Sequence, residues 1–113
     1  MLNAPARCHR YILSSAVLTL PGAYTYQLLS VETARAWLAR DDFVSAIGYD
    51  ITAEAASMLL CTPIRAQRQH IAMEPGDEAL VFRLRMRTRP GMHLSPDFVA
   101  RNAEIGLLQR SVP

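Results

Sequence analysis

Lysine is absent from this chain of 113 residues, whose twelve strongly basic residues are all arginine. Ten acidic residues leave a net charge of only +2, which excludes the uniformly basic surface of a protein that coats DNA. Any anion-binding site is therefore expected to be local. Arginine suits such a site because its planar guanidinium group holds a phosphate through two hydrogen bonds, which an ammonium group cannot do.

Cysteine is scarce, since Cys8 and Cys61 stand alone and neither belongs to a Cys-x-x-Cys pair or a Cys/His cluster. We therefore expect no metal site and no cofactor. Isolated thiols are typical of a reducing compartment. The expected location is the cytoplasm.

Long apolar runs are missing as well. Tyr11–Leu20 follows two arginines and imitates a secretion signal, but three hydroxyl residues interrupt its apolar character and Pro21 is poorly placed for cleavage. No run approaches the roughly 18 apolar residues that a membrane-spanning helix needs. The sequence therefore predicts neither a signal peptide nor a membrane partner.

Half of the residues are apolar, which suffices for one compact domain with a single core. Residues 1–10 contain Pro5 and show no hydrophobic period, so we expect a loose arm followed by one domain over residues 11–113. The pattern predicts a mixed α/β, or α+β, domain of about five strands and three helices. The expected strands and short apolar segments cover Tyr11–Leu20, Tyr24–Leu29, Phe43–Ile47, Gln69–Met73, Ala79–Pro90 and Ile105–Val112. The expected helices cover Val31–Arg40, Thr52–Leu60 and Pro96–Ala103, capped by Ser30, by Asp50 or Thr52, and by Ser95.

The expected strand over Ala79–Pro90 carries the clearest functional signal. Alternate residues are apolar and are expected to face the core: Leu80, Phe82, Leu84 and Met86. The residues between them share the other face and are arginines: Arg83, Arg85, Arg87 and Arg89. Side chains on one face of a strand repeat every ~6.6 Å, close to the spacing of successive phosphates in an extended nucleotide chain. This face favours a polyanion, and the alternative is the ordinary solvated face of an amphipathic strand.

Three further segments combine polar groups with features of a ligand site. Ser45–Glu54 places Gly48 before the free N–H groups of a helix start, which suits phosphate, although an ordinary strand-to-helix turn gives the same pattern. Ser14-Ser15 puts adjacent hydroxyl groups in an apolar strand, either in a pocket or satisfied structurally. Gln67–His70 is a polar patch, more typical of plain surface.

No catalytic constellation is evident. The three histidines are dispersed in sequence, and the chain lacks the nucleophile, metalloprotease and phosphate-loop motifs. The carboxylate pairs Asp41-Asp42 and Asp77-Glu78 fall in expected turns, where they are typical of solvated surface.

Ser14–Thr19, Ser45–Gly48 and Met73–Leu84, in this order, resemble the viral ring-nuclease anti-CRISPR family of type III systems. The resemblance extends from about Tyr11 to Val112. It implies a homodimer that binds a cyclic oligoadenylate, typically cyclic tetraadenylate, and cleaves it by attack of a 2′-hydroxyl without a metal. Duplex DNA is not expected as the main ligand.

The resemblance also implies a set of ligand-binding residues in this chain. They are Ser14, Ser15, Gly48, Asp50, Thr52, Arg68, Arg83 and Arg87. Tyr49 stands where the family has the histidine that protonates the leaving 5′ oxygen, and the family's acidic residue is missing at Arg89-Pro90-Gly91. A phenol has a pKa of ~10 against ~6.5 for imidazole, so tyrosine is the weaker acid at neutral pH.

These observations predict a homodimer that sequesters a cyclic oligonucleotide or opens it slowly, with Tyr49 stacking on adenine or bonding ribose. A nucleic-acid-binding module that uses the face of Arg83, Arg85 and Arg87 is the alternative, marked by strong salt dependence. A third possibility is an interaction protein that keeps the fold and has lost the ligand.

Overall fold

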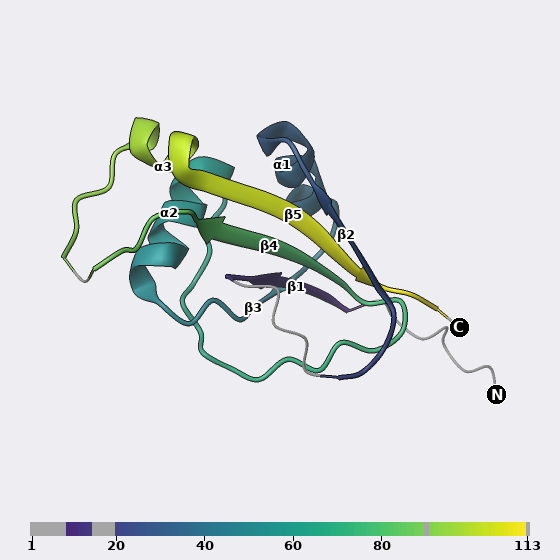
Figure 1. Ribbon diagram of the computed structural model, residues 1–113. Helices are drawn as coiled ribbons and strands as arrows, with labels where there is room; N and C mark the ends of the chain where they lie inside the picture. The colour runs from purple at the N-terminus through teal and green to yellow at the C-terminus, as the bar shows by residue number, and fades with distance from the viewer. Residues whose placement is uncertain (1–8, 15–19, 90, 113) are drawn as a thin grey trace.

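The computed structural model describes residues 9–14, 20–89 and 91–112, which form a five-stranded mixed sheet and three helices (Figure 1). The strands are β1 (Arg10–Leu13), β2 (Tyr24–Leu28), β3 (Val44–Ser45), β4 (Glu78–Leu84) and β5 (Ala103–Arg110). The helices are α1 (Val31–Arg40), α2 (Asp50–Leu60) and α3 (Pro96–Asn102). The strand order is β2-β5-β4-β1-β3, with β1 parallel to both neighbours and β5 antiparallel to both of its own. The expected fold class is confirmed.

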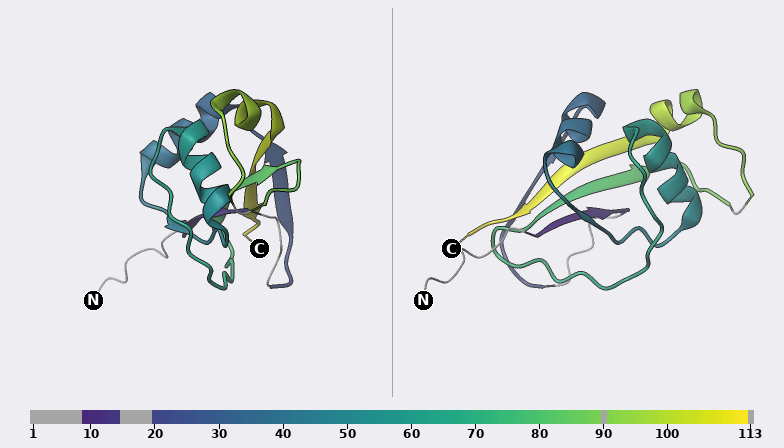
Figure 2. Two further views of the ribbon diagram at one scale, coloured as in Figure 1. Left: turned by 90° about the vertical axis from the view of Figure 1, so that its left-hand side faces the viewer. Right: turned by 180° about the vertical axis from the view of Figure 1, so that it is seen from behind.

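The three helices lie on one side of the sheet, where they bury the main core (Figure 2). Alternate residues of the central strands, such as Ile12, Phe82 and Ile105, pack against Trp37 of α1 and Val99 of α3. The other side holds a smaller cluster: Leu13, Met73, Ala79, Val81 and Leu108. The centre of β4 is consequently buried on both faces.

Helix α1 has the bounds that the sequence predicts. The hydroxyl of Ser30 accepts a hydrogen bond from the backbone N–H of Thr33 at 3.1 Å, as an N-cap residue does. Ala34, Trp37 and Leu38 follow at helical spacing, and all three are buried. Local signals were sufficient here because cap and apolar face lie within one segment.

The arginine strand is shorter than predicted. β4 ends at Leu84, which pairs with Ala103, the first residue of β5. The residues before Ala103 form α3, so β4 has no strand to pair with beyond Leu84. Only Arg83 of the four arginines lies on the strand, and Met86, predicted to face the core, is 48 % exposed. The predicted flat arginine face is therefore wrong, and the last three arginines belong to an irregular segment.

Other predicted bounds also need correction. β1 ends at Leu13, and residues 15–19 of the predicted strand lie outside the described residues. Arg10 belongs to β1 rather than to the predicted arm, whose first eight residues also lie outside the description. Gln69–Met73 forms no strand; this segment is held instead by side-chain bonds such as that of Gln69 Nε2 to the carbonyl of Ser45 at 2.6 Å.

The start of α2 differs from the prediction too. Its N-cap is Tyr49, and no side chain caps the helix, whereas Asp50 or Thr52 was expected to do so. Both of those residues lie inside the helix. The backbone N–H groups of its first turn therefore remain available to another acceptor.

Asp77 and Glu78 are structural residues, not the solvated pair that was predicted. Asp77 is 1 % exposed and accepts hydrogen bonds from the backbone N–H groups of His9 and Glu74 at 3.0 and 2.8 Å. Glu78 accepts from the Trp37 ring nitrogen at 3.0 Å and from Gln109 at 2.7 Å. The two carboxylates tie the start of β4 to its surroundings.

Cys61 offers a direct test of backbone strain. It ends α2 with φ 52° and ψ 38°, a left-handed conformation that side chains with a Cβ disfavour. We expect Cys61→Gly to raise the free energy of unfolding by about 0.5–1 kcal/mol, despite the greater freedom of glycine in the unfolded chain. Urea denaturation measures the change. Cys61→Ala is the control, because it keeps the Cβ and should bring no such gain.

Within the described residues, none of the three helices has the length and apolar character needed to cross a membrane.

Candidate functional site

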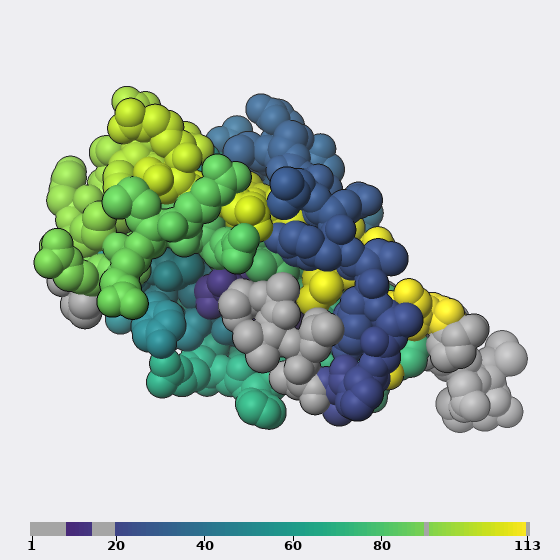
Figure 3. All heavy atoms as spheres, viewed as in Figure 1, coloured from purple at the N-terminus to yellow at the C-terminus, as the bar shows by residue number. Residues whose placement is uncertain are grey.

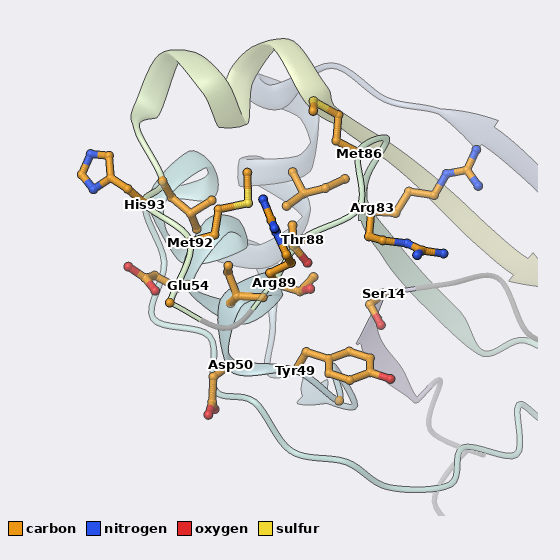
Figure 4. A pocket seen from close by; sticks show the side chains of 17 residues that line it. Ser14, Tyr49, Asp50, Glu54, Arg83, Met86, Thr88, Arg89, Met92 and His93 are labelled. Carbon is orange, nitrogen blue, oxygen red and sulfur yellow. The ribbon is translucent and has the colours of Figure 1, made fainter.

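An open pocket of about 1250 Å³ lies where β1, β4 and the start of α2 meet the segment that leads into α3 (Figure 4). In the space-filling view the purple end of β1 is visible in a hollow between the green residues that follow β4 and the blue-teal residues near the start of α2 (Figure 3). Seven of the nine predicted site residues line this pocket: Ser14, Gly48, Tyr49, Asp50, Thr52, Arg83 and Arg87. Ser15 lies outside the described residues.

The topology explains this convergence. β1 runs parallel to both β3 and β4, so the carboxyl ends of these strands meet at one edge of the sheet. Ser14 directly follows β1, Arg83 lies near the end of β4, and the chain passes from β3 through Gly48 into α2. Crevices outside the carboxyl ends of parallel strands are common ligand sites in α/β sheets.

The charge of the pocket is mixed. Arg83, Arg87 and Arg89 line it together with Asp50 and Glu54, which leaves one net positive charge from these side chains. In Figure 4 the Asp50 carboxylate points away from Arg89, and the labelled side chain of His93, another lining residue, points outward at the rim. One subunit therefore provides a local but modest attraction for anions.

Arg68, the remaining predicted residue, lies beside the pocket and not in its lining. Its Cζ is 5.2 Å from the centroid of the Tyr49 ring, within the range of a cation–π contact. A Cβ at Gly48 would lie 3.4 Å from the Arg68 Nε, so the Arg68 side chain runs alongside this glycine. Arg68 thus borders the pocket through Tyr49, whose side chain is highly exposed.

Glu104 does not line the pocket, but it contacts the lining residue Arg83, a contact that the sequence pattern did not predict. It faces Arg83 across the β4–β5 ladder and accepts a hydrogen bond from the Arg83 Nε at 2.9 Å. The Arg85 Nε lies 4.0 Å from its other oxygen. The hydrogen bond from Arg83 lowers the pKa of Glu104 below its usual value and raises the pKa of Arg83. Only the strand register, which no local signal gives, could have identified this pair.

The hydroxyl of Tyr26 extends this charged group of Arg83, Arg85 and Glu104, on the side of the sheet away from the helices. This hydroxyl lies 3.5 Å from Glu104, and partial burial together with the Glu104 charge raises the pKa of the phenol. A Cβ at Gly106 would lie 2.3 Å from the Tyr26 ring, so the ring occupies space that only a glycine leaves open. The charged group thus spans β2, β5 and β4.

Metal ligands are not gathered at the site. No group of three or more His, Cys, Asp or Glu side chains within residues 9–14, 20–89 and 91–112 could hold a metal ion.

Comparison with known proteins shows the family. The profile of the STIV B116-like family matches residues 10–105, a span that contains all nine predicted site residues. The chain belongs to this family. A relative named "Uncharacterized protein 26", from Sulfolobus islandicus filamentous virus (isolate Iceland/Hveragerdi), is 32 % identical over 85 residues, which cover 72 % of each chain.

A solved STIV B116-like structure confirms the fold. B116 of Sulfolobus turreted icosahedral virus superposes with a TM-score of 0.78, covers 90 % of this chain and 99 % of its own, and is 21 % identical. Both relatives are viral proteins. At this identity the likeness of the structure concerns the fold, and the residues of the pocket carry the case for function.

Proposed function

We propose that two copies of this chain bind one cyclic oligoadenylate, with cyclic tetraadenylate as the expected ring, in the pocket described above. The protein then sequesters the ring or opens it slowly, and so counters or tunes type III CRISPR signalling in the cytoplasm of the host cell. The observation that carries this proposal is that Arg83, Arg87 and Arg89 line the same pocket as the uncapped start of α2. The order of the sequence segments that resemble ring nucleases supports the choice of ligand.

The start of α2 supplies neutral anion-binding groups. Its first-turn N–H groups have no side-chain cap and follow Gly48, which borders the pocket. Unpaired N–H groups and the helix dipole favour a phosphate at such a position. Arginine side chains on the opposite wall then approach the same phosphate from the other side, with charge-assisted hydrogen bonds.

A second subunit would double the modest positive charge that one pocket offers to the ligand. The four phosphates of a cyclic tetranucleotide carry four negative charges, and a single pocket offers one net positive charge from its lining side chains. A two-fold dimer presents the same groups twice, which matches a ring with two-fold symmetry. Homodimerisation is thus part of the proposal.

Tyr49 determines whether the bound cyclic oligoadenylate is sequestered or cleaved. Its ring lies at the pocket beside Arg68, and we assign it to stacking on adenine or bonding ribose. Ring opening requires the 2′-hydroxyl to lose its proton to water as its oxygen attacks the adjacent phosphorus. A P–O2′ bond forms, the P–O5′ bond breaks, and a proton is delivered to the 5′ oxygen. A phenol is a weaker acid than an imidazolium, so tyrosine at this position favours sequestration or slow turnover.

Calorimetry with cyclic tri-, tetra- and hexaadenylate tests the proposal. We expect one ring per dimer with Kd below about 10 μM, because several charge-assisted hydrogen bonds contribute. Mass spectrometry of the heat-released ligand then separates intact ring from linear product. Absence of binding to all three rings would refute the proposal. Equal binding of linear and cyclic ligands, with strong salt dependence, would instead support the alternative nucleic-acid-binding module.

Replacing Arg87 with alanine should weaken binding of the ring. Arg87 lines the pocket, is exposed, and has no ion pair with a described residue, so its guanidinium is available to a phosphate. Loss of one charge-assisted hydrogen bond per subunit removes two such bonds from the single ring that a dimer binds, so Kd should rise by about 100-fold to 10⁴-fold. Calorimetry measures the change. Arg101→Ala is the control, an exposed arginine of α3 that does not line the pocket, and equal losses in both variants would contradict the assignment.

A further inference from the structure

We propose that Glu104 is a positioning residue for the phosphate-binding arginine Arg83, a role that rests on the proposed function of the pocket. Arg83 is the lining arginine closest in sequence to the end of β4, and Glu104 is its direct partner on β5. The inference concerns the state of Arg83 before any ligand arrives.

The contact with Glu104 leaves the two terminal guanidinium nitrogens of Arg83 available to a ligand. Glu104 accepts from Nε at 2.9 Å, and no hydrogen bond to a described residue occupies the two terminal nitrogens of the guanidinium. Those two nitrogens form one of the edges through which arginine holds phosphate bidentately. One side of the guanidinium group is thus fixed while an edge remains for the ligand.

Glu104 is itself held in place. Its side chain is only 16 % exposed, and the Tyr26 hydroxyl donates to the same oxygen that receives the Arg83 bond, at 3.5 Å. The Tyr26 ring lies in the space above Gly106, two residues along β5. Rigid strand positions and a packed aromatic ring therefore fix the carboxylate, which in turn limits the rotamers of Arg83.

Glu104 has two opposite effects on the affinity for an anionic ligand, one through the positioning of Arg83 and one through its own negative charge. A held arginine loses less conformational freedom on binding, which tightens binding, whereas the negative charge of the carboxylate repels an anionic ligand. Glu104→Gln keeps an oxygen that can accept from Arg83 and removes the charge. Glu104→Ala removes both. Because the two variants have equal charge, the difference between them isolates the hydrogen bond.

Two measurements test the role. In calorimetry with cyclic tetraadenylate we expect Glu104→Gln to bind about threefold to tenfold more tightly than Glu104→Ala. In the Arg83→Ala background the two variants should bind equally, because the effect passes through Arg83. Equal affinities of Glu104→Gln and Glu104→Ala while Arg83 is intact, or a difference between them that persists in the Arg83→Ala background, would overturn the inference. Circular dichroism at the assay temperature checks that all variants are folded.

The second measurement needs no ligand. In ¹⁵N spectra the Nε–H of Arg83 should exchange slowly with water in the original protein and in Glu104→Gln, and rapidly in Glu104→Ala. Similar exchange in both variants would overturn the role. If the original protein binds no cyclic oligoadenylate, the proposed function fails, and this spectrum together with titrations using inorganic pyrophosphate still decides whether Glu104 positions Arg83.

Discussion

Replacing Arg10 with methionine is expected to lower the free energy of unfolding by about 3 kcal/mol, because the lost side chain satisfies several buried groups at once. Arg10 is 8 % exposed, and its Cζ lies 3.8 Å from the centroid of the Trp37 ring. Its Nη1 donates to the carbonyls of Asp41 and Asp42 at 2.6 and 3.2 Å, and its Nη2 donates to the carbonyl of Trp37. These carbonyls lie at the end of α1, where a cation is also favourable for the helix dipole.

Two further variants separate the parts of this interaction. Arg10→Lys keeps the charge but loses the planar fork that reaches several carbonyls, so it should retain only part of the stability. Arg40→Ala is the surface control. Its side chain is 63 % exposed and its Nη2 lies 3.3 Å from the Glu78 carboxylate, and loss of an exposed ion pair should cost less than about 1 kcal/mol. Urea denaturation followed by circular dichroism measures all three, and equal midpoints for Arg10→Met and Arg40→Ala would contradict the structural role.

Arg10 also shows why the sequence predicts some elements better than others. From the sequence it belongs to a loose arm with no period, because its contacts lie 27 to 32 residues away, around the end of α1. Helix α1 itself was predicted at both ends, since Ser30 and the apolar spacing are local signals. The end of β4 was not predicted, because it depends on where α3 ends and its partner strand β5 begins.

The candidate site follows the same division. The turn from Gly48 into α2 is visible in the sequence, and the structure places it at the pocket. The partners of Arg83 were not visible, since Glu104 comes opposite to it only through the β4–β5 register. Arg85 was predicted to share a strand face with Arg83, yet it follows the strand and approaches the same carboxylate. Long-range pairing decides which arginines remain available to a ligand.

Replacing Tyr49 with histidine is expected to accelerate opening of a bound cyclic tetraadenylate by about 100-fold at pH 6.5, because a general acid contributes 10²-fold or more. Tyr49 lines the pocket with 60 % of its surface exposed, and its extended backbone at the N-cap of α2 suits histidine equally well. The introduced imidazolium would donate its proton to the 5′ oxygen as the P–O5′ bond breaks. Single-turnover assays with excess protein measure the bond-breaking step apart from binding.

The pH profile and a matched variant identify the cause of any acceleration. The rate of Tyr49→His should fall above about pH 6.5 as the imidazole loses its proton, and the nearby Arg68 guanidinium should move this fall to lower pH. Tyr49→Phe keeps the aromatic side chain and removes the hydroxyl. It should therefore bind cyclic tetraadenylate and open it no faster than the original protein. Equal rates for Tyr49→His and the original protein would contradict the acid role of this position. An increase without the pH dependence would point to improved orientation of the 2′-hydroxyl instead of proton donation.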